Sequence, residues 1–146
     1  MITIEVTPET KQVLINVDKL EGRTKKGLRK ALKETGQEVK REIRRLIKTG
    51  PKTGRSYGTH QASAPGEAPA NRSGRLAKSV NYKVRNWKKM IVGEKASYAG
   101  YLEDGTKNED GTYKIKPRPH IIKAVNNKEQ DTENAILRNV KKETNT

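Results

Sequence analysis

Residues Thr24 to Lys48 read TKKGLRKALKETGQEVKREIRRLIK, and their apolar positions recur at steps of three and four residues. This spacing predicts one long amphipathic helix. The residues of its apolar face are Leu28, Ala31, Leu32, Thr35, Val39, Ile43, Leu46 and Ile47. Thr24 suits the N-cap position, and Gly50 followed by Pro51 is a strong stop signal. Gly36 lies in mid-helix, where glycine costs roughly 1 kcal/mol relative to alanine.

On the N-terminal side of this helix, residues 1–18 contain two short runs in which apolar and polar residues alternate. The first run holds Ile2, Ile4 and Val6, and the second, after Pro8, holds Val13, Ile15 and Val17. Alternation with a period of two is typical of strands that bury one face. The pattern predicts two short strands, or one strand and an extended arm.

On the C-terminal side, residues 49–72 form a long loop rich in glycine and proline. The stretch SAPGEAPANRSGRL, residues 63–76, can be neither helix nor strand because its prolines and glycines break both periods. It stands between two strongly patterned regions, which indicates a functional loop within one domain. Ser73 suits the cap of a short helical turn that runs through Leu76.

Residues 73–116 are predicted to hold the sheet region. Alternation at Val80, Tyr82 and Val84, followed by the apolar run 90–92, predicts a hairpin. Residues 98–102 predict a short helix that Gly105 ends, and the pair Asp110-Gly111 predicts a tight turn. Lys107 to Lys116 reads as an exposed hairpin around that turn.

Residues 117–142 are predicted to form the C-terminal helix, with Pro119 at a first helical position. Its apolar stripe consists of Ile121, Ile122, Val125, Thr132, Ile136 and Val140. Residues 126–133 are polar, which leaves the continuity of the helix open. The expected fold is α+β in a single domain, residues 1–146, with a long basic N-terminal helix and a C-terminal helix packed on a small antiparallel sheet.

The composition limits the core of this chain. Only 31% of the 146 residues are hydrophobic, with no Phe and one Trp, so we expect a thin core that neighbouring subunits help to stabilise. The chain has no Cys, which excludes disulfides and thiolate metal sites. No apolar run approaches the roughly 18 residues that span a bilayer. The N-terminus does not resemble a signal peptide, and we expect a soluble protein, cytoplasmic when made, without membrane contact.

The net charge of +15 lies within residues 24–97, and ten Lys or Arg belong to the predicted basic helix. Such an excess can face phosphate, an acidic protein surface or solvent. The candidates for contact with DNA or an acidic partner are Lys33, Lys40, Arg41, Arg44, Arg45 and Lys48. No aromatic residue lies among the helix cations in the sequence, which argues against base recognition and leaves non-specific, salt-dependent DNA contact open.

Catalytic signals are weak, and we expect no enzyme activity, metal or cofactor. His60 and His120 have no partner at a suggestive spacing, so surface or capping roles are favoured. The pairs Glu103-Asp104 and Glu109-Asp110 adjoin turn glycines and are interpreted as turn formers. Residues 50–58 do not match a phosphate-binding loop and are interpreted as flexible backbone. A hydrolase would instead need a metal-dependent site at Glu103 or Asp104.

Four blocks of sequence, which together span roughly residues 20–140, occur in a suggestive order. They are the basic helix, SAPGEAP (63–69) running into SGRLAKS (73–79), YAGYLEDGT (98–106), and RPHI (118–121). In this order they resemble the small tail-component proteins that act at the head-to-tail junction of long-tailed bacteriophages, variously called neck, head-tail joining or tail-completion proteins. That family often has aromatic residues where this chain has Asp104 and His120.

The resemblance implies a structural virion protein whose copies assemble into a ring, with six-fold symmetry favoured, at the head-tail junction. Its partners would be itself, the connector or head-completion protein, the tail tube protein and packaged DNA. The assembly interface is assigned to Pro65, Gly66, Pro69, Arg75, Leu76, Tyr98, Tyr101 and Pro119. The Pro/Gly loop would reach a neighbour by ordering on assembly. A free, non-specific DNA-binding accessory protein is the alternative.

Overall fold

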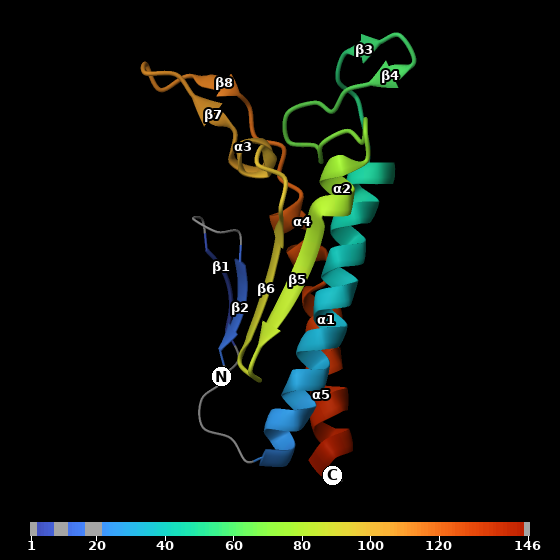
Figure 1. The fold of residues 1–146 in the computed structure, drawn as a ribbon, viewed down its shortest axis with the longest axis vertical. Helices are drawn as coiled ribbons and strands as arrows, with labels where there is room; N and C mark the ends of the chain where they lie inside the picture. Colours follow the sequence, from blue (N-terminus) through green and yellow to red (C-terminus); the bar gives the residue numbers. More distant parts are fainter. Residues whose placement is uncertain (1–2, 8–11, 17–21, 145–146) are drawn as a thin grey trace.

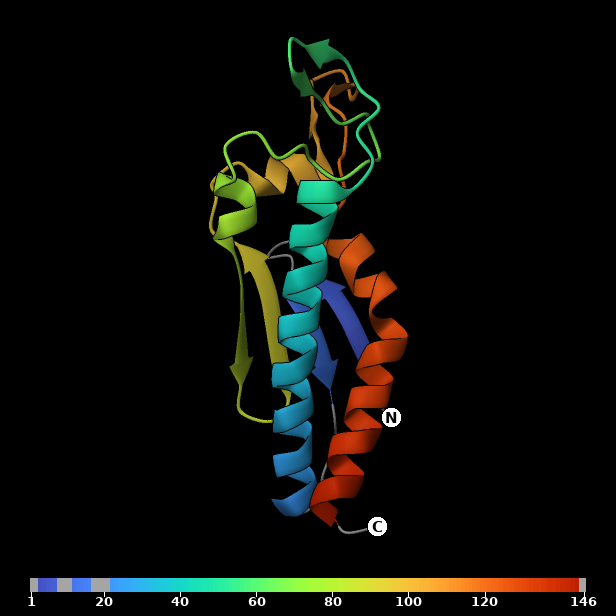
Figure 2. The same cartoon turned by 90° about the vertical axis from the view of Figure 1, so that its right-hand side faces the viewer.

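The computed structural model describes residues 3–7, 12–16 and 22–144, so the predicted strand residues Ile2 and Val17 lie outside the described part. Two helices, α1 (Gly22–Thr49) and α5 (Glu129–Thr144), run side by side and cover one face of a layer of strands, as Figures 1 and 2 show. The strands form antiparallel hairpins. The α+β class is therefore confirmed.

Helix α1 begins two residues before the predicted N-cap and ends one residue beyond the predicted helix. Its apolar stripe is the centre of the core, because Leu28, Ala31, Leu32, Val39, Ile43 and Ile47 are each at most 1% exposed. Gly50 ends the helix by donating its backbone N–H to the Leu46 carbonyl at 3.1 Å. The Lys52 ammonium then caps two terminal carbonyls, those of Leu46 at 3.1 Å and Gly50 at 2.9 Å.

Gly36 is a point of close packing rather than only a weak position in α1. A Cβ at this residue would lie 2.2 Å from the ring of Tyr82, so the aromatic ring occupies the space that a side chain would need. Gly27 likewise allows close packing against α5. A Cβ added at this residue would lie 2.8 Å from the Asn139 carbonyl oxygen and from the Cα of Val140. Both glycines let backbone and ring approach more closely than any other residue allows.

The predicted hairpin consists of β5 (Val80–Arg85) and β6 (Lys89–Glu94), with Arg85 opposite Lys89 across the turn. Asn86 adopts φ 57° there, a conformation that asparagine tolerates better than most residues. Val80, Met90 and Val92 are buried in the core. The N-terminal hairpin, β1 (Thr3–Thr7) and β2 (Gln12–Asn16), lies with β2 beside β6 (Figure 1).

The C-terminal region forms two helices, where the sequence left continuity open. Helix α4 (Ile121–Asn127) has His120 at its N-cap, so Pro119 precedes the helix and the prediction that it takes a first helical position was wrong. Lys128 is the C-cap of α4, and α5 begins at the next residue. The Lys128 carbonyl accepts bonds from both the backbone N–H and the hydroxyl of Thr132, at 2.9 and 2.7 Å. Helix α5 runs antiparallel to α1, and Glu143 near its end forms ion pairs with Lys26 and Lys30.

Two small hairpins project from one end of the helical body, at the top of Figure 1. One consists of β3 (Ser56–Tyr57) and β4 (His60–Gln61), so residues 50–58 are not merely flexible backbone as predicted. The other consists of β7 (Thr106–Lys107) and β8 (Tyr113–Ile115), which confirms the predicted exposed hairpin. Asp110 forms its turn by accepting bonds from the backbone N–H and hydroxyl of Thr112.

Two short helices connect these hairpins to the body. Helix α2 (Arg75–Ser79) has Gly74 and not the predicted Ser73 at its N-cap, and it continues beyond Leu76. Helix α3 (Ala99–Asp104) ends at Gly105 as predicted. Gly105 has φ 74°, and a Cβ there would lie 2.3 Å from the Ile115 carbonyl oxygen. Across the described ranges, no helix is both long and apolar enough to cross a membrane.

Candidate functional site

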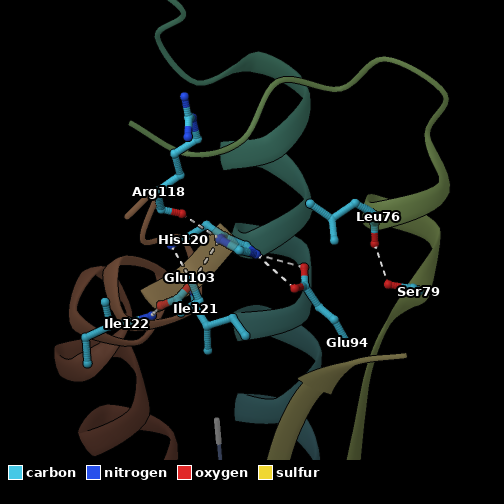
Figure 3. A network of polar contacts seen from close by, with 8 residues as sticks. All are labelled: Leu76, Ser79, Glu94, Glu103, Arg118, His120, Ile121 and Ile122. Carbon is cyan, nitrogen blue, oxygen red and sulfur yellow. Dashed lines mark hydrogen bonds and ion pairs between the residues drawn. The ribbon is translucent and has the colours of Figure 1, made fainter. Parts of the chain in front are cut away.

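A buried cluster of one histidine and two glutamates lies where the projecting hairpins join the body (Figure 3). The His120 Nε2 contacts both carboxylate oxygens of Glu94, at 3.0 and 2.9 Å. Its Nδ1 contacts the Glu103 carboxylate at 2.8 Å and the Arg118 carbonyl at 2.9 Å. The three side chains are 0, 1 and 5% exposed for His120, Glu94 and Glu103. We call them the Glu-His-Glu cluster.

Both ring nitrogens of His120 face oxygen acceptors, so both must donate and the ring is an imidazolium. Burial by itself lowers the pKa of His120, but its bonds to Glu103 and Glu94 outweigh burial and raise the pKa to about 10. Burial likewise opposes ionisation of Glu103, yet hydrogen bonds and charge from His120 lower the pKa of that carboxyl to about 2. The cluster therefore carries two carboxylates around one cation.

Glu103 also caps helix α4 from outside. Its carboxylate accepts backbone N–H bonds from His120 at 2.8 Å, Ile121 at 3.1 Å and Ile122 at 3.1 Å. These are donors that the first turn of a helix leaves unsatisfied. The cluster thus joins three elements, because Glu94 ends β6, Glu103 belongs to α3 and His120 opens α4.

Two predictions for these residues were wrong. His120 was expected in a surface or capping role, and it does occupy the N-cap position of α4, but its side chain makes no cap bond and is a buried ion-pair partner, not a surface group. Glu103 is not a turn former, since its carboxylate is buried against α4. The partners lie 26 and 17 residues from His120 in the chain, so no local pattern could reveal them. The segment Arg118 to Ile121 has no Ser, Thr, Asp or Asn that could cap the helix, and this was the available signal that another group satisfies its first backbone N–H groups.

The sequence blocks of the Pro/Gly loop and the RPHI segment meet beside this cluster. Arg118 donates from Nε to the Ser63 hydroxyl at 2.9 Å, and its backbone N–H bonds to the Leu102 carbonyl at 2.7 Å. Gly66 donates its N–H to the Pro117 carbonyl at 2.9 Å. Residues 63–66 are therefore attached to the segment that opens α4 within a single protomer.

Glu67 folds the same loop onto the end of α1. Its carboxylate accepts bonds from the backbone N–H of Thr53 at 2.9 Å, the Thr53 hydroxyl at 2.6 Å and the N–H of Ala64 at 2.8 Å. These bonds, the Thr53 hydroxyl first, lower the pKa of Glu67 to about 2. The Glu67 side chain thus joins the segment before β3, at Thr53, to the segment after β4, at Ala64.

Replacing Glu67 with Gln is expected to loosen this loop without unfolding the protein. The amide has one acceptor oxygen and places an NH₂ group against a donor, so the backbone N–H groups of Thr53 and Ala64 should exchange with solvent faster. Hydrogen exchange measured residue by residue would detect this change at an unaltered unfolding temperature. Glu109→Gln in the β7–β8 turn is the control, and identical exchange in both variants would contradict the assignment.

The residues predicted for the assembly interface divide into two groups. Leu76 and Pro69 are buried within the protomer, and Leu76 belongs to the hydrophobic core. Pro65, Gly66, Arg75, Tyr98 and Tyr101 are exposed, and Pro119 is partly exposed. Leu76 and Pro69 are therefore not accessible to another molecule, whereas the exposed residues lie on the surface near the projecting hairpins.

Most of the cations predicted for DNA contact have partners within the protomer. Arg44 donates to the Ala77 carbonyl at 3.0 Å, and Lys40 to the Asn81 side chain at 3.3 Å. Arg41 pairs with Glu38, and Arg45 binds the Glu42 carboxylate through two bonds of 2.7 Å. Lys33 and Lys48 are exposed. The middle of α1 is therefore a cross-linked surface rather than a row of open cations.

The chemistry available at the Glu-His-Glu cluster is structural. Both imidazole protons are engaged and the three side chains are closed to solvent, so the ring can neither accept a proton nor meet a substrate as the structure holds it. Among the residues that the structure describes, no group of histidine and acidic side chains has the arrangement of a metal site.

A comparison with protein families gives a match over the first two thirds of the chain. Residues 11–105 match the family described as "Bacteriophage HK97-gp10, putative tail-component". This range contains α1, the Pro/Gly loop, the β5–β6 hairpin and α3, with two of the three members of the cluster. Comparisons with curated proteins and with solved structures gave no match. The match covers well over half of the chain, and the protein belongs to the HK97-gp10-like family of bacteriophage tail components.

Proposed function

We propose that this protein is a structural subunit of the phage head-tail junction, where its copies form a ring, six-fold in the simplest case, between the connector and the tail tube. Membership of a tail-component family supports a place in the virion. The observation that carries the proposal further is the concentration of exposed aromatic and apolar side chains at one end of the molecule. Exposed apolar side chains that cluster in this way are typical of protein interaction surfaces.

We call this surface the apolar end. It comprises Tyr57, Tyr98, Tyr101, Tyr113 and Ile115, and Tyr57 and Tyr101 are each 60% exposed. Among the described residues, the remaining large hydrophobic side chain that is exposed is Leu137. The five side chains come from the two projecting hairpins and from the start of α3 (Figure 1). Tyrosine is enriched at interfaces because its ring is apolar and its hydroxyl bonds to polar partners.

The contacts beneath the apolar end hold its parts in a defined arrangement. Glu67 and Arg118 attach the loop that carries β3–β4, and Glu103 with Gly105 fixes the base of the β7–β8 hairpin. A preorganised surface loses less conformational entropy when it associates. This supports an interface already shaped in the free subunit, in place of a Pro/Gly loop that orders only on assembly.

The test is electron microscopy of lysates from the parent phage with this reading frame deleted, complemented by the intact protein or by a variant. Without complementation we expect DNA-filled heads beside unattached tails, and intact protein should restore joined particles. Normal infectious particles from the deletion would overturn the proposal.

The variant for this test is Tyr57→Ser, Tyr113→Ser and Ile115→Ser combined. These side chains are exposed, so the free energy of unfolding should stay within about 0.5 kcal/mol of wild type for each change. Association should weaken by on the order of tenfold or more per aromatic residue, which abolishes complementation. Leu137→Ser, on the exposed side of α5, is the matched control and should complement fully. Equal complementation by both variants would remove the apolar end from the interface.

A further inference from the structure

The chain's one tryptophan, Trp87, lies against the basic start of α1, and the β5–β6 turn that carries it is at the end of the molecule opposite to the apolar end (Figure 1). Trp87 belongs to the β5–β6 turn, and its ring centroid is 5.2 Å from the Lys25 ammonium and 4.9 Å from the Lys88 ammonium. The absence of aromatic residues among the helix cations in the sequence was therefore misleading. The fold brings Trp87 next to Lys25, although the two residues are sixty-two positions apart in the chain.

These residues line an open groove of about 480 Å³, formed by Lys25, Lys26, Arg29, Asn86 and Trp87. We call it the tryptophan groove. Trp87 packs partly against the hydrophobic core, which fixes the ring while part of it remains on the groove surface. The groove thus combines a rigid aromatic surface with long, flexible cationic side chains.

The charge of the groove is strongly positive. Lys25, Lys26 and Arg29 rise from the first turns of α1, and Lys88 adds a fourth cation from the hairpin turn. Glu143 pairs with Lys26 at 2.9 Å. Lys25 and Lys88 contact the ring of Trp87, so a phosphate that binds them displaces no carboxylate of the residues that the structure describes. This contrasts with Arg41 and Arg45 in mid-helix, whose ion pairs a phosphate would have to break.

We propose that the tryptophan groove binds a single strand of nucleic acid, with phosphates at Lys25, Arg29 and Lys88 and one unpaired base stacked on Trp87. A cationic groove beside an aromatic ring is the arrangement by which proteins bind single strands without sequence preference. An incoming base displaces a flexible lysine ammonium from the ring, and the phosphate next to that base then holds the ammonium. In a duplex the bases are already stacked and cannot reach the ring.

An acidic protein surface is the competing occupant, because it satisfies the same cations. It leaves the exposed face of Trp87 without a matching partner, since carboxylates do not stack on an aromatic ring. The ring therefore favours nucleic acid. This proposal is independent of the head-tail junction function, which uses the opposite end of the molecule.

The experiment uses Trp87 as its own reporter, because any change in tryptophan emission comes from this site. The purified full chain is titrated with a short oligothymidylate, with a duplex of the same length, with polyphosphate and with polyglutamate. We expect the oligothymidylate to quench the emission by stacking, with an affinity that falls steeply as salt rises. Polyphosphate should compete for the groove without quenching to the same extent, and the duplex should bind more weakly.

Two charge variants make the result specific to the groove. Lys25→Gln, Arg29→Gln and Lys88→Gln combined should weaken oligothymidylate binding on the order of tenfold or more. The control variant, with Lys107→Gln, Lys114→Gln and Lys116→Gln combined, removes the same charge from the β7–β8 hairpin. Its affinity for the oligothymidylate should stay within about twofold of wild type. Equal losses in both variants, binding without quenching, or quenching by polyglutamate that matches the oligothymidylate would each overturn the proposal. Anisotropy of a labelled oligothymidylate with Trp87→Leu should show the same loss of affinity as the groove variant.

Discussion

His120→Gln is expected to lower the free energy of unfolding by about 3–5 kcal/mol, because it leaves the carboxylates of Glu94 and Glu103 buried without a cation. Glutamine is similar in volume to histidine and still donates a hydrogen bond, so the change chiefly removes charge. Urea denaturation between pH 4.5 and 6.5 measures the loss, since this range lies above the pKa of Glu103, about 2, and below the pKa of His120, about 10, so both groups are charged in the folded protein. His60→Gln, in the exposed β3–β4 hairpin, is the control and should change stability by at most about 0.5 kcal/mol.

The same cluster predicts a particular pH dependence of stability. The folded-state pKa of His120, about 10, lies above the ordinary value of 6.5. Its stabilisation is therefore complete below pH 6.5 and is lost as the pH rises toward 10. The pKa of Glu103 is lowered from 4.5 to about 2, so its contribution is complete above pH 4.5 and is lost as the pH falls toward 2. His120→Gln should remove the alkaline loss, and a wild-type profile that is flat from pH 6.5 to 10 would show that the imidazole is neutral.

Gly27→Ala is expected to destabilise the protein although alanine is the better helix former. The added methyl group would lie 2.8 Å from the Asn139 carbonyl oxygen and the Val140 Cα, and both are backbone atoms that move only with the whole of α5. Overpacking of this kind costs about 1–3 kcal/mol, against a gain of at most about 1 kcal/mol from helix propensity. We expect a net loss of about 1–2 kcal/mol in urea denaturation.

Gly100→Ala is the matched control for this change. Gly100 lies inside helix α3, and a Cβ there meets no atom within 4 Å. Only the propensity effect remains, so this variant should be as stable as wild type or more stable by up to about 1 kcal/mol. A Gly27→Ala protein that gains stability as Gly100→Ala does would mean that α5 can shift away from α1 at little cost.

Features with a short-range cause were predictable from the sequence. The three and four residue spacing of apolar side chains located α1, and alternation located the β5–β6 hairpin. Turn chemistry located the end of α3 at Gly105 and the turn at Asp110-Gly111. In each case the structure of a segment is determined by residues within that same segment.

Features that depend on contacts between distant residues were not predictable. Gly36 looked like a weakness because the ring of Tyr82, which fills the space above it, lies on a separate hairpin. His120 looked isolated because Glu94 and Glu103 approach it only after β6 and α3 have packed. Trp87 and Lys25 meet for the same reason. The candidate site consists almost entirely of such contacts. The sequence therefore pointed to the segments that form the site, but not to the ion pairs and hydrogen bonds between them.

The elongated body has exposed tyrosines at one extremity and the tryptophan groove at the other, and this arrangement gives each molecule a direction. Copies related by rotation about a common axis all point the same way along it. A ring in which the long axes of the copies lie along that axis has two unlike faces, one with the exposed tyrosines and one with the tryptophan groove. In the proposed ring, such a subunit fits in one orientation only, and the asymmetry of the single chain would then fix which neighbour attaches to which face.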